Sequence, residues 1–120
     1  MKKILVIEDN EEILELLRDV LVKSGFAVVT CQDGCQGVEF THRENPDLIV
    51  LDLMMPAGGG FYVLEKIKMT DETKNIPVVV LTASKDPAHK AKAIDSGVDA
   101  YLEKPYNFPQ LVTTIRGFLG

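Results

Sequence analysis

Short runs of apolar, largely β-branched residues alternate with helix-length segments along the chain. Four clear runs and one weaker run occupy residues 4–7, 27–29, 48–51, 78–81 and 100–103. Because the intervening segments are too long for tight hairpin turns, the pattern indicates repeated βα units. Runs with little polar alternation are typical of strands buried on both faces, as parallel sheets require. We therefore expect an α/β fold.

The segments between these runs carry helix signals. Apolar side chains recur at the spacing of one helix face at Ile13, Leu16, Leu17, Val20 and Leu21. Gly25 then provides a stop signal. Further helices are expected at residues 34–44, 61–69, 87–96 and about 108–119. The last has an apolar stripe of Leu111, Ile115, Phe118 and Leu119, whereas residues 87–96 offer a thin anchor of Ala88, Ala91, Ala93 and Ile94.

The number of βα units limits the architecture. Five units in a chain of 120 residues favour one doubly wound sheet, because a TIM barrel needs eight units and roughly 200 residues or more. The apolar content suffices for a core without disulfides, so residues 1–120 are expected to form a single domain. The leading expectation is a flavodoxin-like (βα)5 sheet with strand order 2-1-3-4-5. That order places ligand sites at the carboxyl ends of the strands.

Polar side chains follow the expected strands at this edge. Glu8-Asp9 follows the first run and Asp52 follows the third. Thr82 follows the fourth run and Lys104 the fifth. Neighbouring strands lie ~4.8 Å apart, so these groups are expected within reach of one ligand. Carboxylates this close repel one another unless a cation intervenes, and their oxygens suit Mg²⁺. Asp52 is then placed to attack phosphorus, with the Lys104 ammonium and the Thr82 hydroxyl on the phosphoryl oxygens.

In this order and spacing, the motifs resemble the receiver domains of two-component response regulators, which are CheY-like phosphorelay proteins. The resemblance covers essentially the whole chain. It is carried by the Glu8-Asp9 pair, Asp52 followed by Met55-Pro56, Thr82-Ala83 and Tyr101-Leu102-Glu103-Lys104-Pro105.

The resemblance implies roles at the reaction centre. Asp52 corresponds to the phosphoacceptor, and Thr82 and Lys104 to the groups that assist catalysis. Lys104-Pro105 corresponds to a cis peptide bond, a conformation largely confined to proline. The implied Mg²⁺ ligands, with Mn²⁺ as a substitute, are Glu8, Asp9, Asp52 and the carbonyl of Met54. The implied protein is a phosphoacceptor signalling domain rather than an enzyme, one that catalyses its own phosphotransfer and dephosphorylation.

The resemblance also implies a switch and its partners. A phosphohistidine on a sensor histidine kinase or a histidine phosphotransfer protein would donate to Asp52. Thr82 would move toward the phosphoryl group and Tyr101 would turn inward into the vacated space, which biases a two-state equilibrium. The surface formed by residues 87–96, 100–103 and 108–119 would then change. That surface would control an output domain or a partner and would serve as the interface of a homodimer.

The loop after Asp52 departs from the family pattern. Many members carry Asp-Gly before the third helix, whereas this chain has Gly58-Gly59-Gly60. Glycine adds conformational freedom that binding must remove, so we hypothesise a looser loop with altered metal affinity or phosphoryl lifetime. The glycines lack the Lys-Ser/Thr ending of a P-loop, which argues against nucleotide binding there.

Other functions stay open on the sequence. A degenerate receiver would act only as a protein-interaction module and would fail to bind Mg²⁺. Aspartyl-nucleophile phosphatases also form a phosphoaspartate, but their pattern is D-x-D after the first strand. Here Asp52-Leu53-Met54 follows the third expected strand and lacks the second acid. A flavodoxin-like module would bind flavin and colour the purified protein yellow.

Composition argues against further classes. The formal net charge is -5 and no basic run is present, which argues against nucleic-acid binding by this domain. The N-terminal apolar stretch, residues 4–7, is too short for a signal peptide or a membrane span, so a cytoplasmic location is expected. Cys31 and Cys35 lack a Cys-x-x-Cys spacing and are expected to be free thiols.

Overall fold

The computed structural model describes residues 1–56 and 59–120, in which strands and helices alternate. The described strands are β1 (Lys3–Ile7), β2 (Ala27–Cys31), β3 (Leu48–Asp52), β4 (Val78–Thr82) and β5 (Ala100–Glu103). The described helices are α1 (Glu11–Lys23), α2 (Gly34–Glu44), α3 (Gly59–Met69), α4 (Pro87–Asp95) and α5 (Phe108–Leu119). The alternation predicted from the apolar runs is confirmed.

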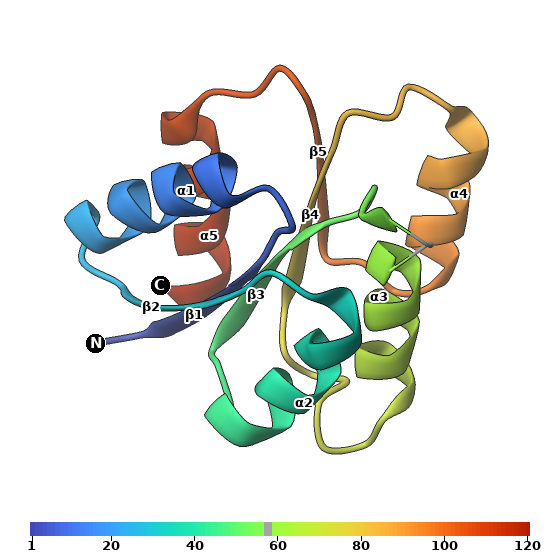
Figure 1. Cartoon of the computed structure of the whole chain (residues 1–120), viewed down its shortest axis with the longest axis horizontal. Helices are drawn as coiled ribbons and strands as arrows, with labels where there is room; N and C mark the ends of the chain where they lie inside the picture. Colours follow the sequence, from blue (N-terminus) through green and yellow to red (C-terminus); the bar gives the residue numbers. More distant parts are fainter. Residues whose placement is uncertain (57–58) are drawn as a thin grey trace.

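These strands form one parallel sheet in the order β2-β1-β3-β4-β5, which confirms the flavodoxin-like topology. β1 lies between β2 and β3, so the winding reverses there (Figure 1). Ile7 pairs with Leu51 across β1 and β3, and Asp52 pairs with Leu81 across β3 and β4. The residues that follow β1 and those that end β3 therefore emerge side by side at the carboxyl edge.

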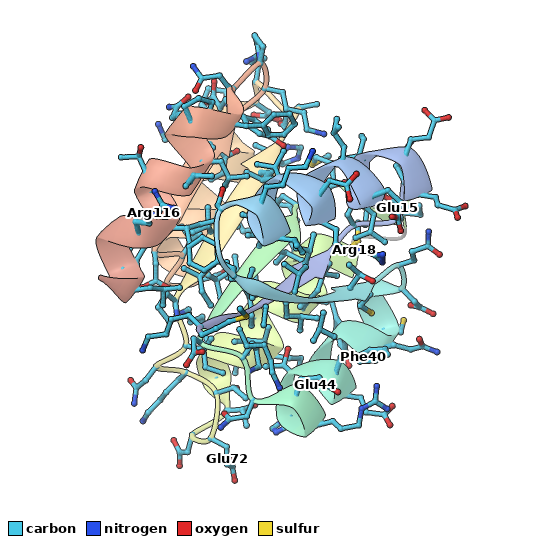
Figure 2. All side chains as sticks on the ribbon, turned by 90° about the vertical axis from the view of Figure 1, so that its left-hand side faces the viewer. Glu15, Arg18, Phe40, Glu44, Glu72 and Arg116 are labelled. Carbon is cyan, nitrogen blue, oxygen red and sulfur yellow. The ribbon has the colours of Figure 1, made fainter. Side chains whose placement is uncertain are left out.

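Helices cover both faces of the sheet (Figure 1). On one face α1 and α5 contribute Leu14, Leu17, Leu21, Leu111 and Ile115 to a buried core. On the other face α3 and α4 contribute Val63, Leu64, Ile67 and Ala93. Arg116 of α5, labelled in Figure 2, donates a hydrogen bond to the carbonyl oxygen of Ser24 at the end of α1 (2.9 Å). Among the described residues, every helix is too short or too polar to cross a lipid bilayer.

Burial on both faces holds for the central strands but not for the edges of the sheet. β3 and β4 are buried almost throughout, and β1 is buried after its first residue. β2 and β5 are mostly half-buried, because each has a neighbouring strand on one side only. The expectation of fully buried strands is therefore wrong for these two.

α1 confirms the predicted helix, but part of its predicted apolar face is wrong. Asn10 caps the first turn by accepting a hydrogen bond from Ile13 N at 3.0 Å, and Gly25 follows the helix with a φ of 98°. Leu14 is buried, whereas Leu16 is 52% exposed. Residues two apart in a helix lie about 200° apart around its axis, so burying Leu14 turns Leu16 outward. The stripe that faces the core is Leu14, Leu17 and Leu21.

The apolar stripes of α4 and α5 are narrower than predicted. Phe118 is 42% exposed because it lies in the last turn of α5, and the packing of that helix rests on Leu111 and Ile115. Among the described residues of α4, Ala93 alone is buried, and Ile94 is 57% exposed. The thin anchor predicted for this helix is therefore confirmed, and it is thinner than the sequence indicated.

The turn after β3 brings α3 so close to Leu53 that Gly60 has no room for a side chain. A Cβ atom at Gly60 would lie 2.1 Å from the Leu53 carbonyl oxygen, far inside van der Waals contact. At Gly59 the same atom would meet nothing nearer than 3.7 Å. Close packing therefore requires glycine at position 60. Gly58 lies outside the described residues, and the looser-loop hypothesis stays a prediction.

Replacing Gly60 with alanine should destabilise the fold by ~2 kcal/mol or more, because overpacking against neighbouring atoms typically costs about 1–3 kcal/mol. Gly117→Ala in α5 is the matched control, since a Cβ there would meet nothing within 4 Å. Helix propensity predicts that this control gains ~0.5–1 kcal/mol. Urea unfolding measures both changes. A Gly60→Ala protein as stable as the wild type would show that Leu53 moves aside without cost.

Candidate functional site

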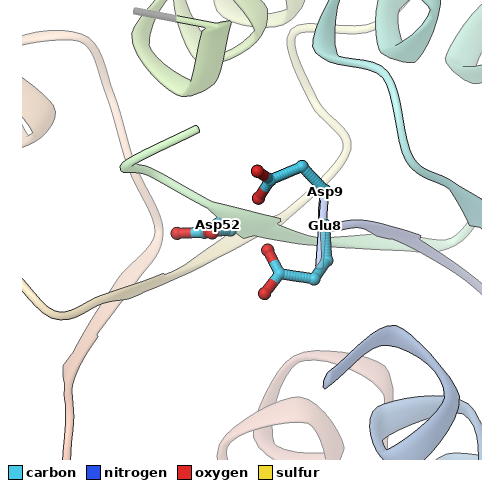
Figure 3. Close-up of side chains that lie close together, drawn as sticks. All are labelled: Glu8, Asp9 and Asp52. Atoms are coloured by element: carbon cyan, nitrogen blue, oxygen red, sulfur yellow. The ribbon is translucent and has the colours of Figure 1, made fainter. Parts of the chain in front are cut away.

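Among the described residues, three carboxylates converge where β1 and β3 end. Glu8 and Asp9 follow the last residue of β1, and Asp52 is the last residue of β3. One carboxylate oxygen from each side chain lies within 4.8 Å of the other two. Figure 3 shows the Glu8 and Asp9 side chains directed toward Asp52 from opposite sides of the chain. The structure thus brings together the acids that the sequence places at neighbouring strand ends.

Backbone contacts fix the positions of these acids. The amide of Glu8 donates to the carbonyl oxygen of Cys31 at 3.0 Å, which extends the pairing of β1 with β2 by one residue. Asp52 Oδ1 accepts a hydrogen bond from the amide of Met54 at 3.1 Å. Glu8 is only 2% exposed, whereas Asp52 is half-buried and Asp9 is exposed. The cluster therefore has a buried side and a side open to solvent.

The surroundings of Glu8 disfavour its charged form. Burial, followed by the hydrogen bond to Asp52 and the negative charge of Asp52, raises the pKa of Glu8 from 4.5 to about 9. Glu8 Oε2 is buried and has no hydrogen-bond partner among the described residues. A divalent cation with oxygen ligands satisfies both this orphaned oxygen and the crowding of the carboxylates. The residues present therefore fit a divalent metal.

Lys104 lines a narrow cavity, too small to hold a water molecule, that it shares with two of the acids. The cavity is lined by Glu8, Asp52, Lys104 and Tyr106, together with apolar side chains of β1, β3, β4 and α1. The amide of Lys104 donates to the carbonyl oxygen of Thr82 at 2.8 Å, and the Lys104–Pro105 peptide bond is cis. Among the described residues, no carboxylate lies within ion-pair distance of the Lys104 ammonium. That ammonium is therefore available to an anionic ligand.

Thr82 and Tyr101 lie close together on neighbouring strands. Thr82 is fully buried, and its Oγ1 accepts a hydrogen bond from the amide of Ser84 at 3.0 Å. The Tyr101 hydroxyl is also buried and has no hydrogen-bond partner among the described residues. Burial, followed by the negative charge of Glu103, raises the pKa of Tyr101, while the adjacent Thr82 side chain acts to lower it. The Tyr101 hydroxyl thus already lies inside the protein.

Tyr106 also belongs to this region, although no motif in the sequence marks it. Its ring lines the cavity beside the acids and also an apolar groove of about 270 Å³ between α1 and the β5–α5 turn. Burial, followed by the negative charges of Glu8 and Asp52, raises the pKa of Tyr106 from 10 to about 12. The one signal in the sequence is its place directly after Lys104-Pro105, and that signal does not show which way the ring turns.

The two cysteines take no part in the site. Cys31 is buried and Cys35 is exposed, and both are free thiols, as the sequence predicted. The sulfur of Cys31 donates to the carbonyl oxygen of Asp33 at 3.1 Å. Its role is therefore local packing at the end of β2.

Comparison with known proteins gives one consistent result. A family model described as the response regulator receiver domain matches residues 4–116. The polar-differentiation response regulator DivK of Brucella anthropi is 31% identical over 119 residues, which cover 99% of this chain and 97% of DivK. The solved structure of Vibrio cholerae chemotaxis protein CheY4 is 27% identical, with a TM-score of 0.90 and 98% of each chain covered. The Mn²⁺-bound form of response regulator Rcp1 is 33% identical, with a TM-score of 0.81, covering 98% of this chain and 91% of that one.

The family model and these relatives extend over nearly the whole chain, and the two solved structures share its fold. Members of the family are signalling domains that bind a divalent metal, and the cluster of Glu8, Asp9 and Asp52 suits such an ion. The chain therefore belongs to the receiver-domain family of two-component response regulators.

Proposed function

We propose that Asp52 accepts a phosphoryl group, in the cytoplasm, from a phosphohistidine on a sensor histidine kinase or a histidine phosphotransfer protein. The observation that carries this proposal is the convergence of Glu8, Asp9 and Asp52 within 4.8 Å, beside a cavity that Lys104 also lines. Asp52 ends the strand that lies between β1 and β4, so it stands between the two acids and Thr82. This central position favours Asp52 over its neighbours as the phosphoacceptor.

The metal in this proposal is Mg²⁺, for which Mn²⁺ can substitute. Glu8, Asp9 and Asp52, with the carbonyl of Met54, would hold it. The bound cation would neutralise the carboxylates and the phosphoryl oxygens during transfer. The orphaned Oε2 of Glu8 supports a cation at this point, and so does the Mn²⁺-bound form of Rcp1 among the similar structures.

Each side chain at the carboxyl edge of the sheet would have a separate role in the reaction. An oxygen of Asp52 forms a bond to phosphorus while the nitrogen–phosphorus bond of the donor breaks, and the released imidazole keeps the electron pair and takes up a proton. Lys104 and Thr82 would contact the phosphoryl oxygens through an ammonium and a hydroxyl. In autodephosphorylation a water oxygen bonds to phosphorus as the Asp52 carboxylate leaves. The domain would thus catalyse its own modification and its own resetting.

Phosphoryl transfer to Asp52 would change the conformation at the carboxyl end of β4. Thr82 would exchange its hydrogen bond from the Ser84 amide for one to a phosphoryl oxygen, and Tyr101 would shift into the vacated space. α4 would respond because its described residues bury Ala93 alone. The surface of α4, β5 and α5 would then control an output domain or a partner, or pair with a second copy of the chain.

Incubation with acetyl phosphate and Mg²⁺ should add one phosphoryl group to the wild-type chain, which intact-mass analysis would show. Asp52→Asn should abolish the gain, because an amide lacks the carboxylate's nucleophilic oxygen. The matched control is Asp71→Asn, since the Asp71 side chain is 90% exposed and lies outside the cluster. This control should react like the wild type. No gain in the wild type, with or without Mg²⁺, would favour a degenerate receiver that acts only as an interaction module.

Asp9→Asn should weaken Mg²⁺ binding at least about tenfold, because disturbing even the outer partners of a metal site typically costs about 10–100-fold in affinity. Isothermal titration calorimetry measures the dissociation constant. Glu12→Gln is the matched control, because Glu12 is an exposed acid in the first turn of α1. Its dissociation constant should equal that of the wild type. The same constant in Asp9→Asn would contradict the assignment of Asp9 as a ligand.

Thr82→Ala should still acquire the phosphoryl group on Asp52, although more slowly, yet lose most of the change at α4. Alanine has no hydroxyl that could turn from the Ser84 amide to a phosphoryl oxygen. Amide hydrogen exchange in α4, measured before and after acetyl phosphate treatment, reports the change, and intact mass reports the modification. A full wild-type change in the phosphorylated variant would contradict the coupling.

A further inference from the structure

A series of polar contacts leads from Thr82 to α4. The amide of Ser84 donates to Thr82 Oγ1 at 3.0 Å, and Ser84 Oγ shares a hydrogen bond with His89 Nδ1 at 2.6 Å. Ser84 Oγ also accepts a hydrogen bond from the amide of Asp86 at 3.2 Å. Ser84 is therefore bonded both to the buried threonine of β4 and to the beginning of the next helix.

His89 joins three parts of the molecule at the first turn of α4. Besides its bond to Ser84, its Nε2 lies 4.0 Å from Asp86 Oδ2. Asp86 is the N-cap of the helix and accepts a hydrogen bond from the amide of Ala88 at 2.9 Å. On its other side the His89 ring contacts the ring of Phe61 in α3, with 5.7 Å between the centroids. The imidazole thus connects the β4–α4 loop, the helix cap and α3.

These contacts matter because little else attaches α4 to the sheet. Ala93 is its one buried residue among those described, and Ile94 is 57% exposed. A helix with so few buried apolar contacts is easily displaced. Lys90 lies over the Tyr101 ring of β5, 5.8 Å from its centroid, and the hydrogen bond between Ser84 and His89 is the contact of α4 that leads to Thr82.

We propose that His89 is a positioning residue that couples α4, through Ser84, to the position of the Thr82 hydroxyl. The inference rests on the proposed function, in which Thr82 turns toward a phosphoryl group on Asp52. When Thr82 Oγ1 turns away, the Ser84 amide loses its acceptor, and Ser84 moves with the imidazole bonded to it. Because His89 lies in the first turn of α4, the helix follows.

The test compares two substitutions of His89 with a control on the same helix. His89→Phe keeps a ring against Phe61 but removes the partner of Ser84, whereas His89→Asn restores a polar group near the place of Nδ1. Lys92→Met is the control, because the Lys92 ammonium lies over the same Phe61 ring, 4.4 Å from its centroid, and the Ser84–His89 hydrogen bond is left intact. Each protein is treated with acetyl phosphate and Mg²⁺, and intact mass and α4 hydrogen exchange are measured together.

His89→Phe should gain the phosphoryl group as the wild type does, while the phosphorylation-dependent change in α4 exchange falls by about threefold or more, the size expected for one lost hydrogen bond. His89→Asn should recover most of the change, and Lys92→Met should retain it. A His89→Phe protein with the full wild-type change, or a loss of equal size in Lys92→Met, would overturn the proposal.

A second measurement on the unphosphorylated protein separates this proposal from the proposed function. Thr82→Val keeps the shape of threonine but removes the acceptor of the Ser84 amide. If Thr82 and α4 are coupled through His89, this substitution should speed α4 exchange about threefold or more, and should have little effect in the His89→Phe background. Equal effects in the two backgrounds would overturn the coupling. A wild-type chain that gains no phosphoryl group would overturn the proposed function, and this cycle would still decide the role of His89.

Discussion

The parallel pairing of β1 with β3 is the constraint on which the site depends. Ile7 is in register with Leu51, so the next residues, Glu8 directly after β1 and Asp52 at the end of β3, lie beside one another. Adjacent parallel strands lie ~4.8 Å apart, which is the distance at which carboxylates can share one divalent cation. Any order that placed another strand between β1 and β3 would roughly double that separation. The reversal of winding at β1 thus determines which side chains lie close together at this edge.

Crowding acids at this edge opposes folding, and the core beneath them offsets the cost. The residues of β1 that precede Glu8, from Ile4 to Ile7, are 0% exposed. Each buried aliphatic side chain of this kind contributes about 1.5–3 kcal/mol. Glu8 is itself buried, with one oxygen lacking a partner among the described residues, and its pKa is raised to about 9. The acids are therefore held in an arrangement that is unfavourable without a counter-charge and favourable with one.

The sequence predicted those features that depend on neighbours along the chain. Strand order, helix positions and the acids at the strand ends follow from apolar periodicity and from the rule that ligands bind at carboxyl edges. Leu16 and Phe118 were assigned to the core wrongly, because periodicity defines a stripe but not the angle at which a helix meets the sheet. The sequence does not mark Tyr106 or His89, because tertiary packing determines which residues their side chains contact. Gly60 looked like a source of freedom in the sequence, whereas its environment leaves no room for a Cβ atom.

The helices are anchored unequally, so some are displaced more easily than others. α1 buries three leucines and is joined to α5 through Arg116 and Ser24, whereas the described residues of α4 bury Ala93 alone. A perturbation at the carboxyl edge meets more packing on the α1 side than on the α4 side. Equal forces therefore produce unequal displacements, and the larger one falls on the helix that contacts the edge through Ser84 and His89. If α4 were packed as firmly as α1, the two helices would share the same perturbation, and the displacement of α4 would be smaller.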